Sequence, residues 1–396
     1  MTAEPGRRVQ GNALFPRPIL LAGVLAVLAA LLLTDLMPRY APGLLRFEHV
    51  MADLRTSFLS DRLASQHPHV AIVGITDQTL SDFKTRLPID RHLLARLVDA
   101  VDAAGAKAIG LDVLFYRTAQ ADNEDLLIDA LARAKAKVVL AAADERLGLS
   151  QPQIDRQLGF LAQVGRPAGY VNLATERDWV VRFKARPAPG SAYPKSFARL
   201  LAESAGHSVS EERRRVAWLR EPLDGSDTFL TIPADTLLGP AEDPLVKAAR
   251  GGLEGKIVII GGLLPDLDQH LTPLTSLTND KMSGPLIHAH IVAEMVDGRS
   301  VGQLEVDSVV LRLGLAFLAG FGFLIGWRYR LKRQGILLSS LATVVILALD
   351  TFAFWQSRII LPIVLALLAW FMGEFSGHYL GRWLGHRPDR AKWFTK

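Results

Sequence analysis

The chain has 396 residues, of which 49% are hydrophobic and 21% charged, with a formal net charge of +5 and no cysteine. The absence of cysteine excludes disulfide bridges and thiol catalysis. The excess positive charge lies mostly beside apolar segments, which favours anionic lipid headgroups over nucleic acid as a partner. We therefore expect no nucleic-acid partner.

Four uncharged apolar segments dominate the sequence, one near its start and three near its end. They occupy residues 18–34, 313–327, 335–349 and 359–373. With its flanks, each approaches the roughly 20 residues that a helix needs to cross a bilayer. We predict four transmembrane helices, at 18–37, 308–327, 335–355 and 359–380.

Basic residues beside these segments indicate their orientation, because short basic flanks stay in the cytoplasm. One side carries Arg7, Arg8, Arg17, Arg328, Arg330, Lys332, Arg333, Arg382, Arg387, Arg390, Lys392 and Lys396. The only short loop on the other side offers Arg358 alone. The predicted cytoplasmic parts are 1–17, 328–334 and 381–396, and residues 38–307 face outward. This layout is typical of a bacterial inner-membrane protein with a periplasmic domain.

The first apolar segment has an alternative interpretation as a cleaved signal peptide, with Arg7 and Arg8 as its charged region. Residues 35–39 offer no small-residue cleavage site, so we favour an uncleaved anchor.

An amphipathic helix is predicted over 43–63, within a juxtamembrane segment at 38–66. Its apolar residues recur at spacings of three and four and form one seam: Leu44, Phe47, Met51, Leu54 and Phe58. This seam either packs on its own domain or pairs with the same seam of a second copy. The second interpretation predicts a homo-oligomer.

An α/β domain is predicted over 67–307. Near-continuous apolar runs, as in strands buried on both faces, occur at 70–75, 108–115, 137–142 and 256–260. Helical spacing at 91–104 and 124–134 separates the first three runs, which predicts a parallel sheet. Asp90 is a candidate N-cap, and Gly105 lies where a helix should end.

The part from 165 to 236 has shorter, more alternating runs, which predict a mixed or antiparallel extension of the sheet. A helix at 196–205 interrupts them. We expect the charged run 211–215 to be a solvated face.

Polar residues follow several predicted strands, where open parallel sheets bind ligands. Taken as a ligand pocket, the candidates are Asp77, Arg91, Asp112, Asp268, His270, Thr272 and His288. The alternative is that these residues cap helices and tie loops to the sheet. Asp266, Asp268 and His270 alternate on one face, but His288 and His290 do not share a helix face, so we assign no metal and no cofactor.

Charged residues also fall within the predicted spans. Arg312 and Asp350 lie at equal depth below the outer surface, which predicts an intramembrane ion pair, unless each extends separately to that surface. Glu374 and His378 are one helical turn apart. They form a face for a partner or a proton relay, or they contact headgroups.

Six motifs, in this order, resemble the second class of CHASE domains, which are extracellular sensory modules of bacterial receptors. They are Asp53-Leu54-Arg55, residues 75–80, 87–91, 105–115, 268–273 and 283–289. The resemblance extends over about residues 45–380, including the three apolar segments after the domain. A tryptophan usually flanks the family's proline, whereas Leu87 and Ile89 flank Pro88 here. Any pocket shaped by that tryptophan therefore differs.

The resemblance implies the input part of a receptor. In the family a cytoplasmic output domain normally follows the last helix, whereas here the predicted tail 381–396 and loop 328–334 are too short for one. We expect a non-enzymatic sensor or accessory subunit that binds a ligand or envelope protein and acts on a separate membrane or envelope protein.

Two alternatives belong to other classes. One is a structural scaffold or assembly subunit of an envelope complex without a ligand. The other is a hydrolase based on Asp77, Asp112, Asp268 and His288, for which no nucleophile–base pair is apparent.

Overall fold

The computed structural model describes residues 17–81, 83, 85–117, 121–209, 215–275, 278, 280–304, 308–329 and 332–385. The predicted cytoplasmic residues 1–16, 330–331 and 386–396 lie outside this part of the chain. The chain divides into two compact units. One is Asp53–Gly302, and the other combines Met1–Ala52 with Gln303–Lys396.

A six-stranded parallel sheet forms the centre of the unit Asp53–Gly302. Its order is β5-β4-β3-β10-β2-β9, and every neighbouring pair is parallel. The strands are β2 (Val70–Ile75), β3 (Ala108–Asp112), β4 (Lys137–Ala142), β5 (Ala168–Tyr170), β9 (Leu230–Pro233) and β10 (Ile257–Gly262). The predicted mostly parallel α/β fold is confirmed.

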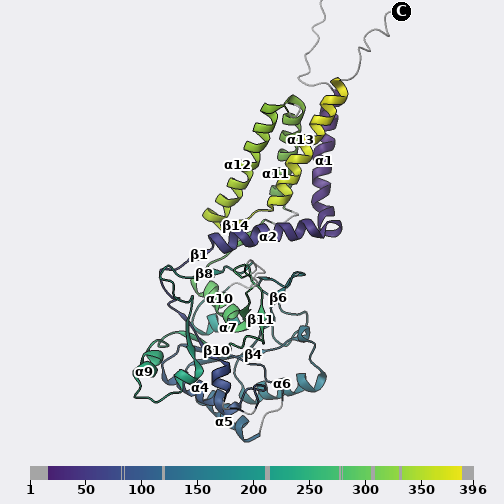
Figure 1. The fold of residues 1–396 in the computed structure, drawn as a ribbon. Coiled ribbons are helices and arrows are strands. Elements are labelled where there is room, and N and C mark those ends of the chain that lie inside the picture. The colour runs from purple at the N-terminus through teal and green to yellow at the C-terminus, as the bar shows by residue number, and fades with distance from the viewer. Residues whose placement is uncertain are drawn as a thin grey trace, which may run out of the picture. The chain divides into compact units, whose positions relative to one another are not determined.

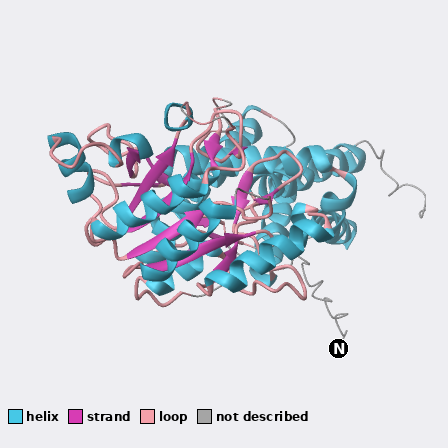
Figure 2. Cartoon of the chain, turned by 90° about the horizontal axis from the view of Figure 1, so that it is seen from below, coloured by secondary structure: helices cyan, strands magenta, loops and turns pink. Residues whose placement is uncertain are grey.

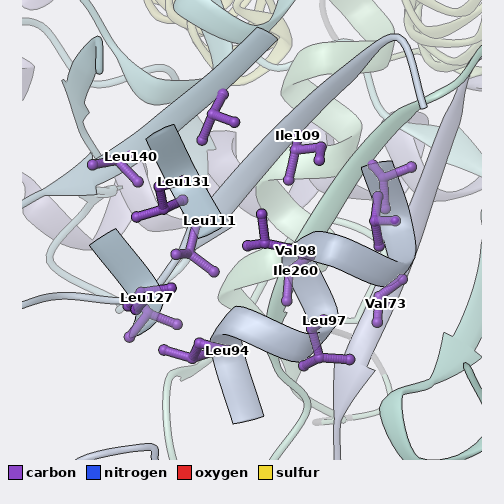
Figure 3. Packing of buried hydrophobic residues seen from close by; sticks show 14 of the residues in the cluster. Val73, Leu94, Leu97, Val98, Ile109, Leu111, Leu127, Leu131, Leu140 and Ile260 are labelled. Atoms are coloured by element: carbon purple, nitrogen blue, oxygen red, sulfur yellow. The ribbon is translucent and has the colours of Figure 1, made fainter. Parts of the chain in front are cut away.

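Helices cover both faces of this sheet, because alternate strand residues point to opposite sides. Residues such as Val73, Ile109 and Leu111 pack against one group of helices (Figure 3). That group is α4 (Arg91–Ala103), α5 (Ala121–Arg133) and α6 (Gln151–Val164). On the other face lie α7 (Phe197–Ser204) and α10 (Gly284–Asp297), and Figure 2 shows the strands among these helices.

Local signals at the ends of α4 behave as predicted. The Asp90 carboxylate accepts a hydrogen bond from the Leu93 backbone N–H at 2.9 Å, which caps the helix. Gly105 follows the helix with a φ of 78°, a conformation that glycine adopts without strain.

The part from 165 to 236 differs from its prediction. β5 and β9 extend the parallel sheet, whereas the short strands β6 (Ala174–Thr175) and β7 (Val181–Phe183) form a separate antiparallel pair, and Phe183 forms an antiparallel bridge to Arg215. The remaining short elements of this unit are β1 (Asp61–Arg62), α3 (Asp77–Leu80), a 3₁₀ turn (Glu145–Leu147), β8 (Leu219–Arg220), α8 (Ala234–Leu237), α9 (Pro244–Gly251), β11 (Gln269–His270) and β12 (Met282–Ser283).

Four long helices belong to the other unit: α1 (Arg17–Tyr40), α11 (Val309–Tyr329), α12 (Arg333–Ser357) and α13 (Ile363–Gly385). They lie alongside one another in Figure 1. Within the described residues, three segments are long and apolar enough to cross a membrane: Val309–Tyr329, Arg333–Ser357 and Ile363–Leu380. The apolar part of α1, Leu20–Leu32, is shorter, so a fourth span is not shown. The short strands β13 (Gly302–Gln303) and β14 (Ile359–Ile360) lie near the ends of these helices.

Glycines bring α11 and α13 into close contact. A Cβ on Gly322 or Gly326 of α11 would collide with the backbone of α13 at Trp370 or Glu374. The relation is mutual, because a Cβ on Gly373 or Gly377 of α13 would collide with the backbone of α11 at Ala319 or Phe323. Such contacts between small residues are how membrane helices pack closely.

The juxtamembrane helix is α2 (Pro42–Leu59), whose first part belongs to the unit of the long helices and whose last part belongs to the sheet unit. In the first part, Leu44 and Met51 pack against the buried cluster of the long helices. Phe47 is 52% exposed, Phe58 is 62% exposed and Leu54 is half-buried. The predicted five-residue seam is therefore divided between an intrachain contact and an exposed surface, and homo-oligomerisation stays a prediction.

Candidate functional site

Strand β3 ends at Asp112, at the carboxyl edge of the sheet. Asp112 pairs in register with Gly261 of β10, and Gly261 pairs with Gly74 of β2. A Cβ on Gly261 would lie 2.5 Å from Cγ of Pro285 and 3.3 Å from Cβ of Asp112. The missing side chain of Gly261 therefore lets the first turn of α10 approach Asp112.

Three polar atoms at this edge are buried without a hydrogen-bond partner in the described part of the chain. They are Oδ2 of Asp112, Oγ of Ser283 and Nδ1 of His288. Ser283 and His288 are each 5% exposed. Buried polar atoms are nearly always hydrogen-bonded, so such a group requires an explanation.

Asp268 and His270 border these atoms and are open to solvent. His270 Nε2 lies 2.8 Å from Oδ1 of Asp268, and the Asp268 side chain is 55% exposed. The backbone carbonyl of Asp268 accepts a hydrogen bond from Gly284 N–H at 2.9 Å. A Cβ on Gly284 would collide with the Asp268 carboxylate, so this carboxylate lies directly at the start of α10.

The electrostatics of this group differ from residue to residue. Burial raises the pKa of Asp112 well above its usual value, and the charge of Asp268 raises it further. Burial lowers the pKa of His288 to about 4, although Asp268 opposes that shift. For Asp268, burial alone would raise the pKa, but the hydrogen bond and charge of His270 lower it overall.

His288 is thus neutral at physiological pH. Its ring hydrogen-bonds to the Val171 backbone and packs edge-on against Phe197, with centroids 5.5 Å apart. Because Nδ1 is not used in a described contact, it offers a lone pair to a donor. Asp112, Asp268, His270 and His288, with Ser283, form one polar group that we call the edge cluster.

Asp77 lies in a separate, exposed group. Arg86 Nη2 is 2.6 Å from Oδ1 of Asp77 and 2.9 Å from Oδ1 of Asp266. All three side chains are more than one-third exposed, so this is a solvated ion-pair group.

Arg91 lies on the opposite face of the sheet from Asp112. Val113 and Phe115 pack on the α4 side, and the Arg91 guanidinium lies 4.5 Å from the centroid of the Phe115 ring. Arg91 is 1% exposed, and burial lowers its pKa to about 10. The structure therefore does not bring Arg91 together with Asp112, as a single pocket would require.

Thr272 is fully buried, and its backbone N–H donates to Oγ1 of Thr275 at 3.0 Å. This local turn supports the structural interpretation for Thr272. The next residue, Pro273, accepts a hydrogen bond at its carbonyl from the Ser57 hydroxyl of α2.

A buried ionic network, which the sequence did not reveal, connects α2 to β7. Asp53 of α2 accepts hydrogen bonds from Arg182 Nε at 2.9 Å and from Nη2 at 2.6 Å. Arg182 also contacts Glu176 and Asp178, each at 2.7 Å. Burial alone would lower the pKa of Arg182, but its bonds to Asp178 and Asp53 raise it.

Arg215 belongs to the same network, with Nη2 3.7 Å from Oδ1 of Asp53. Arg215 is 4% exposed, and burial lowers its pKa to about 10. The prediction that the run 211–215 is solvated is therefore wrong for Arg215, and residues 211–214 lie outside the described chain. Asp53 belongs to the family-like motif Asp53-Leu54-Arg55, and this motif was the one sequence feature that could have indicated the network.

Glu374 is 4% exposed within the long helices. The Ser339 hydroxyl of α12 donates to its Oε2 at 2.5 Å, and the Trp370 indole N–H lies 3.3 Å from that hydroxyl. The Glu374 side chain therefore contacts other helices and not lipid headgroups. His378, one turn later, is half-buried.

Asp350 is buried and Arg312 is exposed. Their ion pair remains a prediction. Among the described residues, no group of three or more His, Asp or Glu is arranged to hold a metal ion.

Comparison with known proteins gives one family. A family model described as CHASE2 domain matches residues 24–326. No curated protein and no solved structure matches the chain significantly.

Proposed function

We propose a ligand-sensing role for this chain, which belongs to the CHASE2 domain family of extracellular sensory domains. The three apolar helices support anchoring in a membrane. The finer parts of the proposal are a bacterial inner membrane, termini in the cytoplasm, a periplasmic sheet unit and α1 as a fourth crossing. The basic flanks and the length of α1 support them.

The edge cluster is the proposed ligand site, and its unpartnered buried atoms carry the proposal. Oδ2 of Asp112 and Nδ1 of His288 are acceptors that a ligand could satisfy, beside the solvent-exposed carboxylate of Asp268. Carboxyl and imidazole acceptors, of which Asp112 can give up its proton to a bound cation, favour a small cation that carries N–H donors, such as an amine. Filling these acceptors would remove the cost of leaving them unpaired.

Two contacts support a route from this site to α2. The segment after His270 receives a hydrogen bond from Val181 N–H at Leu271 O, at 2.8 Å, and a second from Ser57 at Pro273 O. Val181 precedes Arg182, which holds Asp53 of α2. A ligand transmits a signal only if it binds two conformations unequally, and this segment is where we place that difference.

The receiver in this proposal is a separate membrane or envelope protein, and the chain itself acts without catalysis. Co-purification from native membranes in mild detergent tests this part. Recovery of the chain alone would contradict it.

Thermal unfolding of the full chain in nanodiscs tests the ligand site. Small amines and carboxylates are added as a panel, since a ligand stabilises the folded state by mass action, about 2.7 kcal/mol at 100 times Kd. We expect amines to raise Tm and Asp112→Asn to abolish that rise. Asp77→Asn is the matched control, because Asp77 follows strand β2 of the same sheet but lies outside the edge cluster.

The pH dependence sharpens this test. A bound cation lowers the raised pKa of Asp112, so binding releases a proton and affinity increases with pH. Stabilisation by carboxylates instead of amines would contradict the proposed ligand class.

The alternative function is a scaffold or assembly subunit without a ligand. The placement of Asp268 at the start of α10 favours it, because that carboxylate then has a structural role. A panel in which no compound changes Tm, together with recovery of a stable complex, would favour the scaffold.

A further inference from the structure

The first part of α2 carries an exposed apolar surface. Tyr40, just before the helix, is 76% exposed, Phe47 is 52% exposed and Val50 is 43% exposed. Phe47 and Val50 are three residues apart and therefore share a face of the helix. We call Phe47 and Val50 the α2 apolar face, and Tyr40, at the end of α1, is exposed shortly before it.

The depth of this face is fixed by a contact to a membrane span. The Glu48 carboxylate accepts hydrogen bonds from the backbone N–H groups of Ile363 at 2.9 Å and Val364 at 2.8 Å. These residues begin α13, whose apolar span is Ile363–Leu380. This part of α2 therefore lies where a span ends, at the boundary between hydrocarbon and headgroups.

The direction of the face follows from helix geometry. Leu44 and Met51 pack on the long helices, on the same side as Glu48. Phe47 is about 100° around the helix from Glu48, but it lies three residues from Leu44 and four from Met51, so it borders the packed side. α2 runs across the ends of the long helices (Figure 1), and Val50 is about 100° around the helix from Met51, so the apolar face turns away from the side that packs on these helices.

We propose that the first part of α2 is an interfacial helix whose apolar face is inserted among lipid headgroups. A lipid surface fits better than a second copy, because Glu48, the residue after Phe47, binds the first turn of the Ile363–Leu380 span and so holds this face at the depth where the span ends. The exposed Arg46 adds a positive charge beside it, which suits anionic lipids. This inference is independent of the proposed ligand.

Site-directed fluorescence tests this inference cleanly, because the natural chain has no cysteine. Phe47→Cys and Val50→Cys are each labelled with an environment-sensitive fluorophore in nanodiscs of phosphatidylethanolamine and phosphatidylglycerol. Leu223→Cys is the matched control, since Leu223 is an apolar residue of the sheet unit that is 69% exposed. Unchanged thermal unfolding verifies that each labelled variant is folded.

Nitroxide-bearing lipids should quench the labels at 47 and 50 several-fold more than the label at 223. Aqueous iodide should give the opposite order. Iodide quenching at 47 and 50 without lipid quenching would overturn the inference. Efficient crosslinking of Phe47→Cys between two copies, again without lipid quenching, would overturn it in favour of a dimer seam.

Discussion

The sheet unit buries two groups of polar and charged side chains, and the two groups differ in how fully their members are paired. Around Arg182, three carboxylates accept its N–H donors, and Asp53 and Arg182 are 3% and 1% exposed. In the edge cluster, Asp112 and His288 keep buried atoms without described partners. A buried charge is tolerated when it is paired, so Arg182 with its three carboxylates suits a fixed structural link, although Nη2 of the adjacent Arg215 makes no described hydrogen bond. The unpaired acceptors of the edge cluster suit an occupant.

Removing one carboxylate partner of Arg182 should have the largest effect on stability. Asp53→Asn leaves Arg182 buried with fewer counter-charges, and we expect the free energy of unfolding to fall by about 3–5 kcal/mol. Chemical denaturation of the full chain measures it. Asp178→Asn is the control, because that carboxylate is 28% exposed and should matter less. Equal losses would show that burial does not distinguish the contributions of the Asp53 and Asp178 carboxylates.

Acid should destabilise the protein through His288. The pKa of this residue is lowered by burial from 6.5 to about 4, so its contribution to stability is present above pH 6.5 and is lost as pH falls towards 4. The loss is on the order of 3 kcal/mol. His290, lowered to about 3 by burial, acts in the same direction. Denaturation at several pH values should show a smaller acid loss for His288→Gln, and an unchanged loss would refute the assignment.

Crowding the start of α10 should have an intermediate effect. In Gly284→Ala, the added methyl meets the Asp268 carboxylate, and we expect a loss of about 1–3 kcal/mol in thermal unfolding. Gly159→Ala in α6 is the control, because nothing lies within 4 Å of its Cβ position. That control should be neutral or stabilising by about 0.4–1 kcal/mol. Equal changes in stability for the two variants would contradict the close packing of Asp268 against the start of α10.

The smallest expected effect concerns Asp112 itself. Because its pKa is raised in the folded state, its contribution to stability is present at low pH and is lost as pH rises through the raised value. Asp112→Asn should therefore flatten the decline of stability towards alkaline pH. Parallel pH series for the two proteins measure this, and identical slopes would mean that Asp112 is not buried as described.

Local patterns predicted the sheet well where a strand is buried on both faces. The runs at 70–75 and 137–142 coincide with β2 and β4. Leu230–Pro233 joins the edge of the same sheet through a pairing with β2 more than 150 residues away, and nothing local in its sequence indicates that partner.

The candidate site was predicted in part for a similar reason. Parallel sheets bind ligands at the carboxyl ends of their strands, and this predicted that Asp112 and Asp268 lie near one another. The same reasoning does not indicate which face of the sheet a preceding helix covers. Arg91 was therefore grouped with Asp112, although the sheet separates them. Asp53 and Arg182 are 129 residues apart, and only the folded chain brings them together.

The glycine contacts between α11 and α13 limit how the membrane part can rearrange. Where backbone rests on backbone, a small axial slip drives carbonyl oxygens into the facing chain, so the two helices should tilt or rotate only as one rigid rod. More freedom to shift then remains with α12, because only 11% of its apolar segment is buried. If a signal crosses the bilayer as we propose, it would travel as a change in helix tilt and not as an axial shift of one helix past another.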